Sequence, residues 1–194
     1  MLRCRDVNLK LNAKKFQFKV KQVMWMGHLL SSTGVMPHPY RVQDIKDMTP
    51  PHDMIGVQRF LGMCNYLSRF TPNLAQVVKP LTELTHGNAV WSWSSQHDKA
   101  FETAKSLIAN AATLKFFDVN KPCVLQVDAL DSGLGGALLQ DGQPVAFTSL
   151  TLSATEVNYA PVEKECLAIK VACTMFYQYL YGKQDVVVHS DHHR

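Results

Sequence analysis

Residues 123–148, with the sequence CVLQVDALDSGLGGALLQDGQPVAFT, decide the fold class. Three short apolar stretches are predicted to be strands: Cys123–Val127, Gly135–Gln140 and Pro144–Ser149. The Asp141-Gly142 pair between the last two is a strong hairpin signal, and strands this close in sequence pair antiparallel. A long helix is predicted over 155–181, and the apolar run 185–190 is predicted to be a buried strand. The expected order is therefore βββαβ.

The sequence before this unit predicts a short strand region followed by helices. Residues 7–30 indicate strand, turn, strand, with the second strand over 23–30 and a short helix over 40–48 between prolines. Residues 53–110 have helical periodicity and predict three helices. The first helix is expected to carry an apolar stripe that runs from Ile55 to Phe70 and includes Phe60 or, alternatively, Val57. The second helix is expected to kink or divide at Pro80. The third is expected to be capped by Ser95 with Asp98, and its apolar stripe consists of Ala100, Phe101, Ala104, Leu107 and Ile108. The fold class is α+β.

Composition excludes several classes of protein. The 194 residues are 46% hydrophobic and have a formal net charge of +4, from 20 Lys and Arg against 16 Asp and Glu. This mild excess permits contact with nucleic acid without requiring it. No uncharged apolar run is long enough to span a membrane, and the N-terminus lacks a secretory signal. Five scattered cysteines indicate reduced thiols of an intracellular protein.

Three acidic residues form the candidate catalytic site. Asp128 is expected to end the first strand of the βββαβ unit, Glu165 to lie in the long helix, and Asp191 to end the last strand. Each carboxylate alone is as readily explained as an ordinary surface group. Together on adjacent strands and a packed helix they would repel one another unless a cation neutralised them. Mg²⁺, or alternatively Mn²⁺, is the expected ion because its preferred ligands are oxygens.

Helix geometry favours Glu165 over Glu163 as the helical member of this site. The expected core stripe of the long helix consists of Val162, Cys166, Ile169, Cys173, Phe176 and Leu180. Glu165 lies about 60° from its centre beside the small residues Ala168 and Ala172, whereas Glu163 lies about 100° away on the other flank.

Other candidate ligands and binding groups receive weaker support from the sequence. The histidines near Asp191 lack a zinc-ligand spacing, and the glycines at 133–136 lack the spacing of a nucleotide-binding loop. Trp91 and Trp93 are more readily explained by packing than by stacking on bases.

Ordered motifs resemble one known family. They are WMGHLLSSTGV at 25–35, RFLGMCNYLSRF at 59–70, KPLTEL at 79–84, WSW at 91–93, VDA at 127–129, NYAPVEKECLAI at 158–169 and SDH at 190–192. In this order they resemble the Pol polyprotein of Ty3/Gypsy-type retrotransposons. The resemblance implies the end of a reverse transcriptase palm over 1–40, a helical thumb and connection over 41–115, and a C-terminally truncated ribonuclease H-like domain over 116–194.

The resemblance also implies functional residues and partners. Asp128, Glu165 and Asp191 match three of the four metal-binding carboxylates of ribonuclease H, an endonuclease that hydrolyses the RNA strand of a hybrid with two metal ions. The stretch 24–30 matches the primer grip. The implied contacts to an RNA·DNA hybrid or primer-template duplex are Trp25, Met26, Gly27, His28, Arg59, Asn65, Tyr66 and Arg69. A solvated helix face is an equally good explanation of the last four residues.

Departures from the family pattern limit the expected activity. The aspartate pair of the RNA-directed DNA polymerase is absent, Val127 stands where the family has a small residue or Thr, and the fourth ribonuclease H carboxylate is expected beyond residue 194. We therefore expect no polymerisation and slow or no cleavage by this chain alone. The implied partner is the rest of the Pol polyprotein, in a cytoplasmic particle or the nucleus. The alternative function is that of a non-catalytic remnant that binds nucleic acid or protein.

Overall fold

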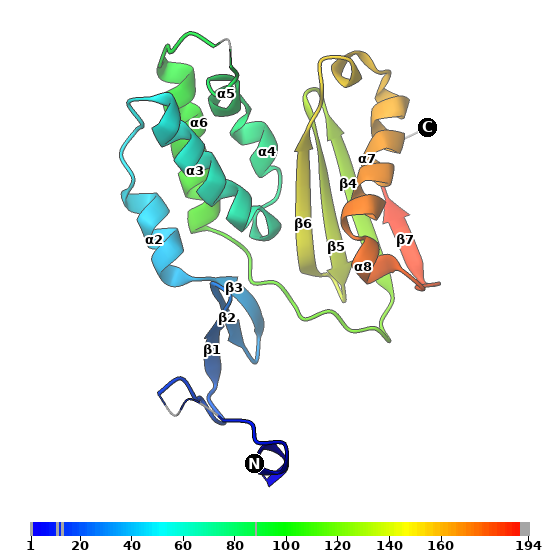
Figure 1. Ribbon diagram of the computed structural model, residues 1–194. Coiled ribbons are helices and arrows are strands. Elements are labelled where there is room, and N and C mark those ends of the chain that lie inside the picture. The colour runs from blue at the N-terminus through cyan, green and yellow to red at the C-terminus, as the bar shows by residue number, and fades with distance from the viewer. Residues whose placement is uncertain (1, 11, 13, 88, 191–194) are drawn as a thin grey trace.

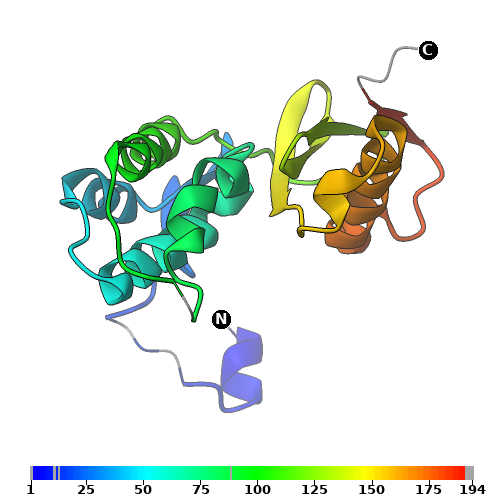
Figure 2. The same cartoon turned by 90° about the horizontal axis from the view of Figure 1, so that it is seen from above.

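The computed structural model describes residues 2–10, 12, 14–87 and 89–190. It contains a small N-terminal sheet, a helical module and a larger sheet with helices on one face (Figure 1). The helical module and the larger sheet lie side by side, with strand β6 (Gln143–Thr151) nearest the helical module (Figure 2). The fold is α+β, as the sequence predicts.

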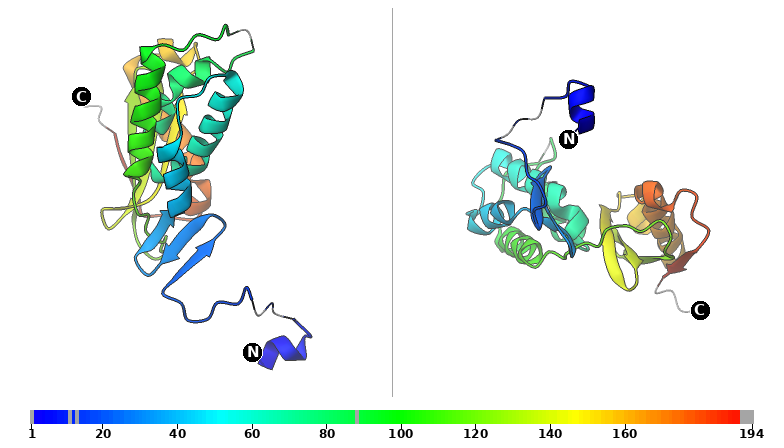
Figure 3. Two further views of the ribbon diagram at one scale, coloured as in Figure 1. Left: turned by 90° about the vertical axis from the view of Figure 1, so that its left-hand side faces the viewer. Right: turned by 90° about the horizontal axis from the view of Figure 1, so that it is seen from below.

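The N-terminal part is a three-stranded antiparallel sheet of order β1-β2-β3. Its elements are α1 (Leu2–Asp6), β1 (Gln22–Trp25), β2 (His28–Ser31) and β3 (Gly34–Pro37). Figure 3 shows the chain before β1 extending away from this sheet. The strand expected between residues 7 and 20 is not formed by the residues described there, where Phe16 and Phe18 are exposed. No neighbouring surface covers them, so the alternating pattern has no face to bury.

The second expected strand, over 23–30, is wrong as a single element. It is a hairpin, because Met26 and Gly27 both take positive φ angles (49° and 76°) and reverse the chain between β1 and β2. Positive φ at two central residues suits a tight turn between twisted strands.

The helical module contains α2 (Pro39–Asp47), α3 (Met54–Leu67), the short 3₁₀ helix η1 (Ser68–Phe70), α4 (Leu74–Val77), α5 (Lys79–Glu83) and α6 (Ser95–Ala109). Its core is centred on aromatic and aliphatic side chains with no exposed surface: Ile45, Phe60, Phe70, Phe101 and Ile108. The expected second helix is divided into α4 and α5 just before Pro80, as proline chemistry predicts. Ile55 is exposed, and Val57 and Phe60 occupy the core instead.

The cap of α6 also differs from expectation. Ser95 is the first helical residue, and the backbone N–H of Ser94 donates to Nδ1 of His97 at 2.9 Å. Asp98 instead accepts a hydrogen bond from Nε1 of Trp93 at 2.7 Å. The cap is therefore one residue earlier than predicted.

The larger sheet has the order β6-β5-β4-β7. Its strands are β4 (Cys123–Leu130), β5 (Gly133–Gln140), β6 (Gln143–Thr151) and β7 (Val186–His189). The first three pair antiparallel, and β7 pairs parallel to β4 in a register that puts His189 opposite Gln126. The expectation that the last strand, β7, is buried is wrong. Val187 and Val188 are 53% and 41% exposed, because in the described part of the chain β7 has a neighbour on one side only.

The helices after β6 are η2 (Glu156–Asn158), α7 (Pro161–Met175) and α8 (Tyr177–Leu180). The single long helix expected over 155–181 is therefore divided, with Pro161 in the first turn of α7 and a break at Phe176. The expected apolar stripe is confirmed only in part: Ile169, Phe176 and Leu180 pack in the core, whereas Val162, Cys166 and Cys173 are exposed. The fully buried residues of α7 are Ala168 and Ala172. A Cβ added to Gly136 would lie 3.3 Å from Cβ of Ala172, so small side chains allow α7 to approach the sheet closely.

The helical module and the larger sheet meet at β6. The backbone N–H of Ala75 donates to Oγ of Ser149 at 3.1 Å, and Oγ1 of Thr151 donates to the Ala75 carbonyl oxygen at 3.3 Å. A Cβ added to Gly135 would meet Asn73, whereas one added to Gly136 would meet α7, so the two sides of the sheet face different neighbours. Among the described residues, no helix has the length and hydropathy needed to span a bilayer.

Candidate functional site

The β1–β2 turn is attached to helix α3 by direct contacts. The Tyr66 hydroxyl donates to the Met26 carbonyl oxygen at 2.6 Å, across 40 residues of sequence. The His28 ring stacks on Tyr66, with ring centroids 5.3 Å apart and planes 15° apart. A Cβ on Gly27 would collide with the Tyr66 hydroxyl. The structure therefore brings together four of the predicted nucleic-acid contacts in one cluster.

Two arginines flank this cluster. The Arg41 guanidinium lies 4.7 Å from the Tyr66 ring centroid, and that of Arg69 lies 5.5 Å from the Phe70 ring centroid. Burial lowers the pKa of His28, and the nearby positive charges of Arg69 and Arg41 lower it further. His28 is therefore neutral at pH 7, and the arginines supply the positive charge of the cluster.

The remaining predicted contacts lie around this cluster. Trp25 and Met26, at the tip of the hairpin, are 62% and 72% exposed. Arg59 is exposed and lies two helical turns before Tyr66, on the same side of α3. Asn65 is exposed and, together with Arg69, lines a cavity beside β6. Exposed aromatic and basic side chains are suited to contact bases and phosphates.

Sequence reasoning missed Arg41 as part of this surface. It lies in the first turns of α2, directly after the hairpin sheet, and its contact with Tyr66 depends on the relative positions of α2 and α3. A basic residue close in sequence to the primer-grip-like stretch is the signal that could have drawn attention to it.

Asp128 lies within β4, opposite Gly135, and not at the end of the strand as expected. Its neighbour Val127 is buried in the core under α7, so strand alternation directs Asp128 to the opposite side of the sheet. There the half-buried Asp128 lines a cavity of about 190 Å³ together with Asn73 and Gln126.

The two glutamates of α7 have different surroundings. Glu165 is half-buried, and its Oε2 accepts a hydrogen bond of 2.6 Å from Oγ of Ser190, which follows β7. Glu163 is exposed, and its Oε2 accepts a hydrogen bond of 2.8 Å from the backbone N–H of Ala160 at the start of α7. Glu165 therefore contacts the chain at the end of β7, and Glu163 caps its own helix.

Asp191, the third predicted carboxylate, lies outside the described residues. Within the described ranges, no group of three or more His, Cys, Asp or Glu side chains is arranged to hold a metal ion. The oxygen donors of Asp128 and Glu165 are nevertheless of the type that Mg²⁺ and Mn²⁺ prefer.

Comparison with known proteins identifies the relatives of this chain. Residues 93–188 match the family described as the RNase H-like domain found in reverse transcriptase. The chain is 37% identical over 188 residues to the retrovirus-related Pol polyprotein from transposon 297 of Drosophila melanogaster, with 96% of this chain and 18% of the relative covered. It is 30% identical over 205 residues to the corresponding polyprotein from transposon gypsy of the same organism, with 99% and 20% covered. The chain thus spans about a fifth of the length of these relatives.

A solved structure shows the same arrangement of elements. The foamy viral protease-reverse transcriptase in complex with an RNA/DNA hybrid superposes with a TM-score of 0.81 at 25% identity, over 93% of this chain and 25% of that one. The fold, the matched domain and the sequence relatives agree. The chain belongs to the Pol polyproteins of Ty3/Gypsy-type retrotransposons and contains an RNase H-like domain of reverse transcriptase.

Proposed function

We propose that this chain binds the RNA·DNA hybrid or primer-template duplex of a reverse transcriptase and contributes carboxylates to metal-dependent hydrolysis of the RNA strand. The observation that carries the binding part is the packing of the hairpin turn on α3, through the Tyr66 to Met26 hydrogen bond. The foamy viral relative was solved with an RNA/DNA hybrid, which supports this class of ligand.

The proposed binding surface consists of the hairpin tip and the exposed side of α3. Trp25 and Met26 offer apolar surface to the sugars and bases of a strand, and Arg41 and Arg59 offer charge to phosphates. Because His28 is neutral, it adds no charge at pH 7, and its ring acts as a packing surface under Tyr66. The hairpin and α3 would therefore contact the duplex as one unit.

The proposed hydrolytic site consists of Asp128, Glu165 and Asp191. Bound Mg²⁺ or Mn²⁺ would activate a water molecule and stabilise negative charge on the phosphate. The Ser190 hydroxyl donates to Glu165 and so restrains the rotation of this carboxylate, and α7 holds its backbone against the sheet through Ala168 and Ala172. Asp128 is held by the ladder that pairs β4 with β5. These contacts restrain the backbone of Asp128 and the side chain of Glu165.

Fluorescence anisotropy of a labelled RNA·DNA hybrid tests the binding part. Since the formal net charge is only +4, we expect weak affinity that falls steeply with salt, because phosphate neutralisation releases counterions. Arg59→Gln should lower the affinity and reduce the salt slope by about 1. Lys99→Gln removes the same charge from an exposed position on α6 and serves as the control.

Two outcomes would contradict this proposal. Binding that is insensitive to salt would exclude contact mainly through the phosphate backbone. Equal losses in the Arg59 and Lys99 variants would show that the hairpin and α3 do not form the binding surface.

A further inference from the structure

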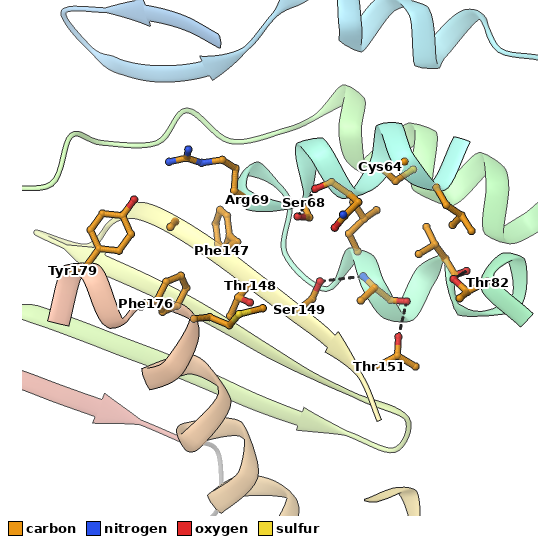
Figure 4. Close-up of a pocket in the computed structure, with 18 residues that line it drawn as sticks. Cys64, Ser68, Arg69, Thr82, Phe147, Thr148, Ser149, Thr151, Phe176 and Tyr179 are labelled. Carbon is orange, nitrogen blue, oxygen red and sulfur yellow. Dashed lines mark hydrogen bonds between the residues drawn. The ribbon is translucent and has the colours of Figure 1, made fainter. Parts of the chain in front are cut away.

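A large cavity lies along the outer edge of β6, between the helical module and helices α7 and α8 (Figure 4). Its volume is about 690 Å³, within the range of pockets that bind small molecules. The helical module contributes Leu61, Cys64, Arg69, Leu74 and Val78, and the other side contributes Phe147, Thr148, Met175, Phe176 and Tyr179. Asp128 and Glu165 do not line it, whereas Asn65 and Arg69, two of the predicted nucleic-acid contacts, do.

Aromatic side chains occupy one end of the cavity. Phe147 comes from β6, Phe176 from the break between α7 and α8, and Tyr179 from α8. In Figure 4 the Arg69 side chain extends toward this end. Aromatic walls favour a ligand with a flat ring system, because rings pack well in offset or edge-to-face arrangements.

Arg69 is the one residue of this lining that carries a full charge at neutral pH. Its Nε is buried without a hydrogen-bond partner, and it forms no ion pair with a carboxylate among the described residues. Cys64 adds no negative charge, because burial raises the pKa of its thiol to about 12. A buried donor without an acceptor is costly, so an anionic acceptor at this place would be stabilised.

Four hydroxyl groups of the lining already form hydrogen bonds within the protein. Ser68 donates to the Asn65 carbonyl oxygen and Thr82 to that of Val78. Ser149 and Thr151 bond to the backbone of Ala75 and so join the two sides of the cavity. Thr148 and Tyr179 offer further hydroxyl groups, and Arg69 is the group of the lining whose charge would select an anionic end of a ligand.

We propose that this cavity binds a small aromatic anion, with its ring system among Phe147, Phe176 and Tyr179 and its acidic group against Arg69. The ligand would contact both the helical module and the larger sheet and would hold them together. Because Asn65 and Arg69 are also predicted nucleic-acid contacts, the test uses the chain without nucleic acid, so that its failure is distinguishable from a failure of duplex binding.

Anilinonaphthalene sulfonate, a fluorescent aromatic anion, is a suitable probe. We expect saturable binding with one site per chain, and a shift of the Met175 methyl signal in a chain with isotope-labelled methionines. Met175 lines the cavity, and Met36 in β3 lies outside it and should not shift. Absence of saturable binding, or shifts that leave Met175 unchanged, would overturn the proposal.

Gly62 provides a matched pair of variants. It lines the cavity, and a Cβ added to it has no atom within 4 Å, so a side chain can begin there without a clash. Gly62→Trp should fill the cavity and weaken probe binding at least about tenfold, whereas Gly62→Ala should retain it. If Gly62→Trp binds the probe as the parent does, the cavity is not the site.

Arg69→Gln tests the charge. It should lower the affinity for the anionic probe by about tenfold. The affinity for phenylnaphthylamine, an uncharged relative of the probe, should not change. Circular dichroism of the variant establishes that it is folded. Equal effects on both probes would show that Arg69 does not recognise the acidic group. Should Arg69→Gln fail to fold, Arg69→Lys keeps the charge and should retain most of the anionic binding.

Discussion

The helical module and the larger sheet bury their apolar side chains to different degrees. In the helical module Phe60, Phe70 and Phe101 have no exposed surface, and helices enclose them. In the larger sheet Leu125 and Leu138 are equally buried, yet β7 leaves Val187 and Val188 exposed at the edge. Four of the predicted nucleic-acid contacts lie on α3 and η1 of the enclosed part, and the other four lie in the hairpin that packs on α3. Ser190, the hydrogen-bond donor to Glu165, follows the exposed strand. We therefore expect destabilising mutations in other parts of the chain to disturb the acidic site more than the duplex-binding surface.

The largest effect should come from the core of the helical module. Phe101→Ala should cost about 3–5 kcal/mol of unfolding free energy, because it leaves a cavity among fully buried neighbours. Val188→Ala in β7 should cost less than about 1 kcal/mol, because that side chain is already partly in water. Urea unfolding followed by circular dichroism measures both, because Trp25, Trp91 and Trp93 lie outside the larger sheet. Comparable costs would contradict the contrast between the two regions.

A smaller effect is expected at the hairpin turn. Gly27→Ala should cost about 1–2 kcal/mol or more, because φ is 76° and the new Cβ would collide with the Tyr66 hydroxyl. Gly62→Ala, inside α3 and in open space, is the matched control and should stabilise the chain by up to about 1 kcal/mol. The two urea midpoints should move in opposite directions. A shift of both in the same direction would show that the turn is not fixed against α3.

The third prediction concerns pH. The pKa of His28 lies below its ordinary value of 6.5, so the unfolded chain takes up a proton at this residue more readily than the folded chain. The stabilising contribution is therefore fully present above about pH 6.5 and is lost as the pH falls through the lower pKa of the folded state. Unfolding free energies of the parent and of His28→Phe should diverge on acidification, with the flatter profile in the variant. Parallel profiles would contradict the packing of a neutral His28 between two arginines.

The fold was predictable where periodicity is strong. The three antiparallel strands and the neighbouring positions of β4 and β7 follow from apolar runs and turn signals, and the stripe of α6 follows from helical spacing. The β1–β2 turn was missed because Met26-Gly27 is not a common turn pair, and its conformation depends on contact with Tyr66. The division of the long helix was missed because apolar residues continue past Phe176.

The candidate site was predictable only in part. Small residues on α7 indicated the side that approaches the sheet, and on that side Glu165 contacts Ser190. The stripe through Cys166 and Cys173 was wrong because close packing selects Ala168 and Ala172 instead. The position of Asp128 inside β4 depends on how far β5 extends the ladder, which strand composition does not determine. The assignment of all three carboxylates to a metal site stays a prediction.

The central proposal is that Asp128, Glu165 and Asp191, and not Glu163, hold a divalent metal ion. Titration of the chain with Mn²⁺, followed by electron paramagnetic resonance, measures the affinity directly. Asp128→Asn and Glu165→Gln should each weaken Mn²⁺ binding at least about tenfold, because each removes a carboxylate ligand. Glu163→Gln removes the same charge from the same helix and should leave the affinity unchanged. Loss of affinity in the Glu163 variant, or full affinity in the Glu165 variant, would contradict the account.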